Sequence, residues 1–283
     1  MGGLAAAACS KFLGAPLFVE LHGNHYFAPV RSGIIGKIEY YAYRLFSKVS
    51  FAAATQIRTL SDEMSASLRA HYGEKVSRKI VMIPTRVDLE IFSNIKKDYR
   101  IGSKLKLITV GSLSPRKNHI NLMRDLAAGN LPFELTIVGD GLLRNQYLQV
   151  IDELNISSQV ILTGNMAHSD LADLLITQDI YIHYSLSEGL PRAILEAMAV
   201  ALPVITSPVG FTKNIFLNGE NSVILENPLA ASLRRELGEI SLSIEMRCKL
   251  GISARKLIED KFNANDIFRL YRAAVLQMTS MSN

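Results

Sequence analysis

Two glutamates stand eight residues apart in the segment SLSEGLPRAILE, which begins at Ser185. The apolar run at residues 179–183 predicts a short strand, and Pro191 favours the first position of a helix. Glu188 should then lie on the loop between strand and helix, with Glu196 more than one turn inside the helix. Carboxylates so placed cannot touch, but they could accept hydrogen bonds from hydroxyls at two ends of one ligand.

The helix start between these carboxylates offers a third kind of contact. Free backbone N–H groups at a helix N-terminus favour an anion, so a sugar, a phosphate group and a ribose could be bound in that order. Taken alone, glutamates at this spacing are more often two solvated residues beside an amphipathic helix.

The residues around the pair resemble the donor-binding half of the family-4 glycosyltransferases. The pattern continues through LPVITSPVG and NGENS after the predicted helix. Three earlier segments match the family in the same order: LITVGSLSPRKN at 107–118, LTIVGDG at 135–141 and VILTG at 160–164. The match is most specific between about residues 105 and 226, and before it the main anchors are residues 19–23 and 83–88.

This resemblance implies a GT-B fold, an α/β architecture in which two Rossmann-like, doubly wound domains face a cleft. The expected domains are residues 1–100 on the acceptor side, residues 101–262 for the nucleotide sugar, and a helix at 263–283 that crosses back or packs within the second domain. Relatives begin with a first strand and a glycine-rich acceptor loop. The N-terminal domain is therefore expected to be incomplete, lacking roughly 70–100 residues.

The resemblance also assigns roles around the predicted helix start. Glu188 would hold hydroxyls of the transferred sugar and belong to the catalytic residues, while Glu196 would hold the ribose hydroxyls. Gly189 and Leu190 would offer backbone N–H groups to sugar or phosphate. The family retains anomeric configuration, and its favoured mechanism is attack on the front face, with the leaving phosphate helping to deprotonate the acceptor.

A second loop would bind the donor diphosphate. It begins at Gly111 and carries Arg116 and Lys117, and the family's lysine at the place of Lys117 contacts the diphosphate. Fixed positive charge there would stabilise the leaving group. Many relatives have arginine where this chain has Ser112, so Arg116 is expected to supply the second charge. An isolated Arg-Lys pair would also fit a solvated loop.

One histidine of the N-terminal half stands at a matched position. His22 ends the strand predicted at residues 16–21, where the family places a histidine near the reacting sugar, so it is a second catalytic candidate. The other histidines carry no site prediction: His25, His71, His119, His168 and His183.

The layout after residue 105 predicts a parallel sheet. Apolar runs lie at 105–110, 134–138, 159–162, 179–184 and 203–206, and amphipathic stretches lie at 118–128, 141–152, 168–175 and 191–200. Such alternation is typical of βα units around a buried sheet. Ligands bind outside the carboxyl ends of such strands, where the loops at Gly111–Lys117, Gly139–Gly141, Gly164 and Ser185–Gly189 should converge.

Other nucleotide and metal chemistries lack their motifs. Gly139 and Gly141 supply two glycines of a dinucleotide fingerprint, but Arg144 occupies the place of the third. There is no phosphate-binding Walker loop, and no Asp-x-Asp pair is present to hold a metal. We therefore expect no cofactor and a nucleotide-diphosphate sugar as substrate, with the diphosphate neutralised by cationic side chains and helix ends.

Composition indicates a location. The 283 residues are 48% hydrophobic, no apolar run approaches the roughly 20 residues of a membrane span, and the two cysteines form no metal or redox motif, which favours a cytoplasmic protein. Residues 1–100 carry 14 Lys and Arg against 8 Asp and Glu, leaving 17 against 18 for the remainder. A basic, aromatic-rich helix at about 31–48 fits peripheral contact with an anionic membrane, or a solvated helix packed on its own sheet. Nothing supports nucleic-acid binding.

Three functions stay open at this point. The first is a hexosyltransferase-type glycosyltransferase acting on a lipid-linked or polysaccharide acceptor. The second is a catalytically incomplete subunit or fragment that binds a nucleotide sugar, and the third is a nucleotide-sugar epimerase on the same fold. Transfer to an acceptor, or product formation without one, would separate them.

Overall fold

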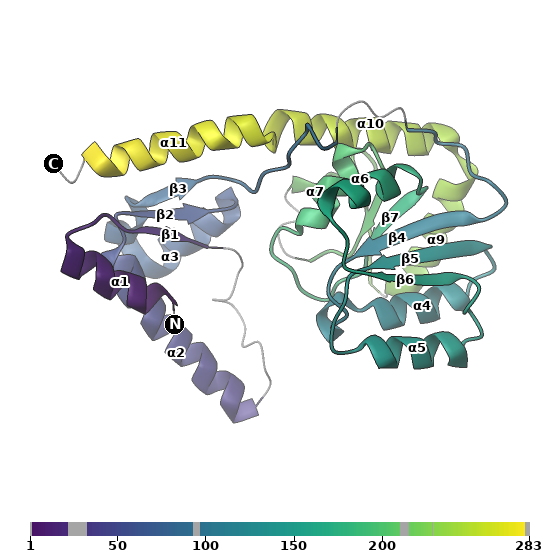
Figure 1. The fold of residues 1–283 in the computed structure, drawn as a ribbon, viewed down its shortest axis with the longest axis horizontal. Helices are drawn as coiled ribbons and strands as arrows, with labels where there is room; N and C mark the ends of the chain where they lie inside the picture. The colour runs from purple at the N-terminus through teal and green to yellow at the C-terminus, as the bar shows by residue number, and fades with distance from the viewer. Residues whose placement is uncertain (1, 22–32, 93–96, 210–214, 228, 281–283) are drawn as a thin grey trace. The chain divides into compact units, whose positions relative to one another are not determined.

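The computed structural model describes residues 2–21, 33–92, 97–209, 215–227 and 229–280 (Figure 1). His22 lies outside the described residues. Contacts divide the chain into two compact units, Met1–Arg86 with Ala264–Asn283, and Val87–Asn263. This boundary falls before the one expected at residue 100, and the final helix belongs to the first unit.

The second unit is built on a six-stranded parallel sheet in the order β6-β5-β4-β7-β8-β9. Its strands are β4 (Leu105–Val110), β5 (Phe133–Val138), β6 (Val160–Gly164), β7 (Ile180–His183), β8 (Val204–Thr206) and β9 (Val223–Ile224). This is the doubly wound order in which the chain reverses direction across the sheet between its two central strands. Sheets of this order generally bind ligands beyond the carboxyl ends of the strands at the reversal, which are β4 and β7 here.

Helices cover both faces of this sheet, as Figure 1 shows for α4 and α5 on one face and for α6, α7 and α10 on the other. Their bounds are η1 (Pro115–Lys117), α4 (His119–Ala127), α5 (Arg144–Glu153), α6 (His168–Ile176), α7 (Arg192–Ala199), α9 (Leu229–Leu242) and α10 (Ile244–Lys261). The elements expected between residues 105 and 206 are confirmed, with ends that differ by at most three residues. Double coverage explains why the central strands are almost wholly apolar.

The first unit is a three-stranded parallel sheet in the order β1-β2-β3. Its strands are β1 (Phe18–Glu20), β2 (Gln56–Thr59) and β3 (Ile80–Met82), and its helices are α1 (Gly2–Leu13), α2 (Gly33–Ala53), α3 (Asp62–Ser77) and α11 (Ala264–Ser280). Helix α11 packs on this sheet through Ile267 and Ala274, which form an apolar cluster with Ile83.

Polar contacts fix the C-terminal helix to the same sheet. Arg58 is buried on β2, and its guanidinium lies 3.2 Å from the Glu20 carboxylate. The Tyr271 hydroxyl of α11 donates a 2.6 Å hydrogen bond to the same carboxylate. The guanidinium of Arg86 lies 4.7 Å from the centre of the Phe268 ring, so its cation stacks on α11.

Candidate functional site

Close backbone packing shapes the loops that follow β4 and β5. Gly139 has φ +132, and a Cβ placed on it would lie 2.2 Å from the carbonyl oxygen of Gly111. A Cβ on Gly141 would lie 2.6 Å from the Leu113 carbonyl oxygen. Both positions therefore require glycine, because any side chain would push the two loops apart.

The absence of a side chain at Gly111 makes room for the side chain of Lys117. A Cβ at Gly111 would lie 2.6 Å from Cε of Lys117, so the lysine stem passes directly over this glycine. The Gly111 N–H donates to the Val138 carbonyl at 2.9 Å. The Gly111 N–H is thus already hydrogen-bonded within the sheet, and the Lys117 side chain fills the space next to Gly111.

The loops after β4 and β7 meet through a cluster of charges. The Lys117 ammonium lies 2.7 Å from one Glu188 carboxylate oxygen, and an Arg116 guanidinium nitrogen lies 2.6 Å from the other. The Ser185 hydroxyl donates to Glu188 at 3.2 Å. The Lys117 and Glu188 side chains are nearly buried, whereas Arg116 is half-exposed. Two cations against one carboxylate leave an excess positive charge, which suits an anionic ligand.

Backbone contacts hold this cluster in register. The Leu186 N–H donates to the Arg116 carbonyl at 2.9 Å, and Arg116 in turn donates from its guanidinium to the Ser187 carbonyl at 3.2 Å. The two loops are thus linked by hydrogen bonds as well as by ion pairs. Lys117 ends the short helix η1, and Asn118 follows it in the left-handed conformation with φ 59. That turn lets α4 start immediately after the cationic pair.

Two buried histidines lie in the field of Lys117. Burial, and to a smaller extent the nearby Lys117 charge, lower the pKa of His119 to about 3. Burial and the same lysine hold the pKa of His183 well below its ordinary value. Both rings are therefore neutral near pH 7, and His119 lies 3.3 Å from the Thr109 hydroxyl. They therefore add no positive charge near Lys117.

Glu196 belongs to a second polar group. Its carboxylate on α7 lies 3.5 Å from Arg192 Nε, one helical turn earlier, and 3.4 Å from His168 Nδ1. Burial raises the pKa of Glu196, while His168 and Arg192 act to lower it. The pKa of Tyr181 is raised by its burial and then by the Glu196 charge. One carboxylate with one permanent cation suits hydrogen bonds with neutral hydroxyls better than a second anion.

The predicted residues thus fall into two groups. Gly111, Arg116, Lys117 and Glu188 come together between the loops after β4 and β7, and Gly189 and Leu190 continue that loop. Glu196 lies with other partners on α7. His22 falls outside the described residues, so its expected role stays a prediction.

Sequence reasoning missed two partners of the glutamates. His168 was given no role, yet it opens α6 just after β6 ends, at the same edge of the sheet as the other loops. Arg192 stands four residues before Glu196, a spacing that places two side chains on one face of a helix. Both could have been found by applying the topology rule and the helical spacing to every polar residue near these loops.

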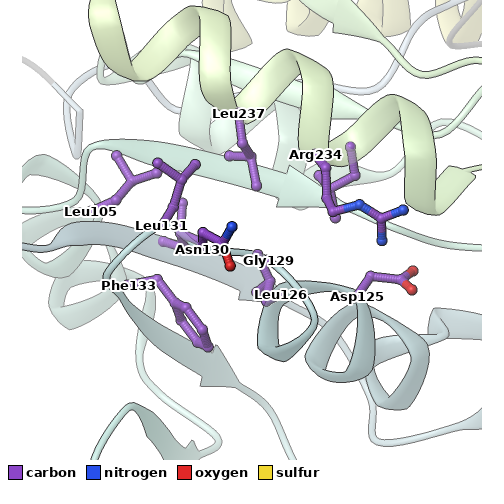
Figure 2. Close-up of a pocket in the computed structure, with 11 residues that line it drawn as sticks. Leu105, Asp125, Leu126, Gly129, Asn130, Leu131, Phe133, Arg234 and Leu237 are labelled. Carbon is purple, nitrogen blue, oxygen red and sulfur yellow. The ribbon is translucent and has the colours of Figure 1, made fainter.

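A separate pocket lies at the other edge of the sheet. Its cavity volume is about 70 Å³, and Leu105 and Phe133, which line it, are the first residues of β4 and β5. Figure 2 shows Asp125 of α4 and Arg234 of α9 near each other on one side of it, with mostly apolar side chains lining the rest. Small-molecule sites usually enclose about 300–1,000 Å³. This cavity is too small for a nucleotide and lies away from the charged loops.

Metal-binding clusters and membrane-spanning helices are both absent from the part of the chain that the structure describes. No group of three His, Cys, Asp or Glu side chains is arranged to hold a metal ion within the ranges that the structure describes. None of the helices traced there is long and apolar enough to cross a membrane.

Comparison with known proteins places this geometry in a family context. A family model described as glycosyl transferases group 1 matches residues 92–257. An uncharacterised glycosyltransferase of Methanocaldococcus jannaschii is 24% identical over 254 residues, covering 90% of this chain and 66% of that protein. The GPI3 subunit of phosphatidylinositol N-acetylglucosaminyltransferase from Saccharomyces cerevisiae is 27% identical over 162 residues, covering 54% of this chain and 36% of that protein. The chain thus spans less than two thirds of these relatives.

A solved structure agrees in fold. HepE of Anabaena, crystallised with UDP and glucose, matches with a TM-score of 0.79 at 18% identity, covering 98% of this chain and 75% of that one. Together with the parallel, doubly wound sheet, this likeness confirms the GT-B fold.

Proposed function

Because the chain belongs to the glycosyl transferases group 1 family, we propose that it moves a hexose from a nucleotide-diphosphate sugar to a lipid-linked or polysaccharide acceptor. We further propose that the reaction retains the anomeric configuration, in the manner of the family-4 enzymes with paired glutamates, and that it needs no metal ion. The epimerase and the binding-subunit alternatives are not favoured by the family match.

One observation carries the proposal: Glu188 is held between Lys117 and Arg116 where the chain reverses across the sheet. Doubly wound sheets bind ligands at this point. A diphosphate entering there would replace the Glu188 carboxylate as partner of both cations. Glu188 would then be free to accept hydrogen bonds from the sugar hydroxyls, so that one exchange prepares both ends of the donor.

The chemical step we propose follows from these partners. The acceptor hydroxyl oxygen forms a bond to the anomeric carbon, and the bond from that carbon to the diphosphate oxygen breaks. The acceptor proton passes to the leaving diphosphate. Lys117 and Arg116 would stabilise the negative charge that develops on the leaving group, and this preorganised charge would supply much of the rate.

The remaining residues would orient the donor. Glu196 would accept hydrogen bonds from the ribose hydroxyls. Its contacts with His168 and Arg192 favour the ionised carboxylate, which acts only as an acceptor. Gly189 and Leu190, just before α7, would offer backbone N–H groups to the sugar or phosphate. His22 is proposed to act near the reacting sugar, from the strand end before Gly23.

A lipid-linked acceptor would be presented to the protein at the cytoplasmic face of a membrane. We propose a cytoplasmic, peripheral protein because the N-terminal half is basic and because the GPI3 relative belongs, by name, to a transferase that acts on phosphatidylinositol.

Calorimetry with a panel of nucleoside diphosphates and their sugars tests the donor site directly, and UDP heads the panel because HepE holds it. We expect one nucleotide to bind and both Lys117→Ala and Glu196→Ala to weaken it. Lys104→Ala, an exposed lysine at the opposite edge of the sheet, is the matched control. A folded chain that binds no nucleotide would overturn the donor site. Product formed from the sugar nucleotide without any acceptor would instead favour the epimerase.

A further inference from the structure

Helix α2 is apolar on the side that faces away from its own unit. Ile34, Ile38, Tyr41, Leu45 and Val49 recur every three or four residues, and each is between 47% and 78% exposed. The opposite side carries the helix's buried residues, Gly36, Ser47, Ser50 and Phe51. An amphipathic helix needs only one apolar face to pack on its protein, so this second, outward stripe is unexplained by the fold.

Basic side chains run along one border of the stripe. Lys37 and Lys48 are exposed and, with Arg44, project between the outward stripe and the buried side. Arg44 is half-buried, with its guanidinium 5.6 Å from the centre of the Tyr40 ring. Long cationic side chains in this position can lay their stems along an apolar layer and place their charges at its polar boundary.

The stripe leads into a groove that is lined by cations. Ala52 continues the stripe beyond Val49 and forms one wall of an open groove of about 690 Å³. The lining residues include Lys48, Lys75, Arg78 and Lys79, together with the Tyr72 ring, and they include no carboxylate. The nearby Glu74 pairs with Arg78 at 3.1 Å, which leaves the groove with a large positive excess.

A bend in α3 shapes the groove. Gly73 has φ 71 inside the helix, so the chain turns between Tyr72 and Lys75 and both side chains reach the same groove. Lys79 is fixed to the end of α2, where its ammonium donates to the Ala52 carbonyl at 2.7 Å and to the Phe51 carbonyl at 3.2 Å. The groove is thus a connected feature of α2, α3 and the start of β3.

We propose that the outward stripe of α2 and this basic groove form one docking surface for a bilayer containing anionic lipid, with the groove receiving a phosphate headgroup. Apolar side chains and adjoining cations on one helix are what binding in the plane of a membrane interface requires. Nucleic acid would match the basic groove but not the apolar stripe. An apolar partner helix would match the stripe but not the groove. The inference deepens the proposed function, on which it rests, by naming the surface through which the enzyme meets its lipid phase.

Vesicle flotation tests the surface on the full chain. We expect binding to vesicles of phosphatidylcholine with about a third phosphatidylglycerol, little binding to phosphatidylcholine alone, and release as salt is raised. The double variant Ile38→Ser/Leu45→Ser should lose most of the bound fraction. Lys75→Gln should lower the partition coefficient about fivefold, since each surface cation near anionic lipid contributes about 1 kcal/mol.

Matched controls lie in the second unit. Leu242→Ser removes a leucine that is even more exposed than Ile38 and Leu45, Lys104→Gln removes an exposed lysine, and neither should change flotation. Circular dichroism verifies that each variant is folded. The proposal is overturned if the folded wild type does not float with anionic vesicles, if the α2 and Lys75 variants float as well as the controls, or if free glycerol phosphate binds but vesicles do not.

Nucleotide calorimetry on the same variants separates this proposal from the proposed function. UDP binding that is intact in Ile38→Ser/Leu45→Ser, together with lost flotation, supports the docking surface. UDP binding without any flotation of the wild type would overturn the docking surface and leave the donor site standing. Flotation without any nucleotide binding would overturn the donor site and leave the docking surface standing.

Discussion

The Lys117 ammonium and the Glu188 carboxylate form a 2.7 Å ion pair in which both side chains are no more than 10% exposed. The two residues are 71 positions apart in sequence, on the loops that follow β4 and β7. Because these are the neighbouring strands at which the sheet reverses, the pair joins the two halves of the doubly wound unit. A buried charge must keep a partner, so any ligand that takes Lys117 from Glu188 must also leave Glu188 with new hydrogen bonds.

Removing the lysine should therefore cost affinity more than stability. In Lys117→Ala, Glu188 keeps Arg116 and Ser185 as partners, while a bound diphosphate loses one of its two cations. A hydrogen bond to a charged group contributes about 1.5–3 kcal/mol, so we expect nucleotide affinity to fall about ten- to hundredfold in calorimetry. Lys104→Ala should bind as the wild type does. Unchanged affinity in a folded Lys117→Ala chain would remove this lysine from the donor site.

Glu188→Gln should strengthen binding of the diphosphate and weaken transfer of the sugar. The glutamate competes with the diphosphate for Lys117 and Arg116, and the neutral amide would release both cations. We expect the free nucleoside diphosphate to bind several-fold more tightly to this variant, while transfer from the sugar nucleotide falls at least about a hundredfold. Calorimetry measures the first effect and a radiolabelled-sugar assay the second. Weaker nucleotide binding would contradict the exchange of partners proposed here.

Sequence patterns predicted the second unit well because its signals are local and strong. Alternating apolar and amphipathic runs located its strands and helices, and the topology rule placed the loops of Gly111 and Glu188 at one edge. The sequence could not show which side chains from different elements contact each other. The contact of His168 with Glu196 joins α6 to α7, and no local pattern indicates which histidine lies near a carboxylate in space.

The first unit was harder to predict for a physical reason. Its strands are three or four residues long, too short for an alternating pattern to stand out, and β2 is buried at every position although it contains Gln56, Arg58 and Thr59. Arg58 is stabilised there by Glu20 on β1 and by the Tyr271 ring, 4.8 Å from its guanidinium, on the distant C-terminal helix. Such compensation becomes visible only when three segments are brought together.

Gly139→Ala should destabilise the second unit without touching a charged residue. The new Cβ would meet the Gly111 carbonyl, and φ +132 is a conformation that alanine rarely adopts. We expect a loss of about 2–4 kcal/mol in the free energy of unfolding, measured with urea. Gly102→Ala is the matched control, because a Cβ there meets nothing within 4 Å and it should change stability by less than about 0.5 kcal/mol. Equal effects of both substitutions would show that the loops after β4 and β5 are not tightly packed.

Nucleotide binding should weaken in acid because of Glu196. Burial raises the pKa of this carboxyl above its ordinary value of 4.5, so it becomes protonated at a higher pH than an exposed glutamate and can then no longer act as a pure acceptor for ribose hydroxyls. Calorimetry at decreasing pH below about pH 7 should show nucleotide affinity falling in the wild type as this carboxyl becomes protonated. Glu196→Gln should bind more weakly at pH 7 but vary much less with pH.

The same shift has the opposite consequence for stability. A carboxyl with a raised pKa in the folded state binds more protons there than in the unfolded chain, so its contribution is favourable below pH 4.5 and is lost as the pH rises through the folded-state pKa. The free energy of unfolding of wild type relative to Glu196→Gln should therefore decline across this window. His168→Gln removes a neighbour that lowers the pKa of Glu196, so both the loss of affinity and the decline in stability should extend to higher pH. Curves that stay in place would mean that His168 does not act on Glu196 in solution.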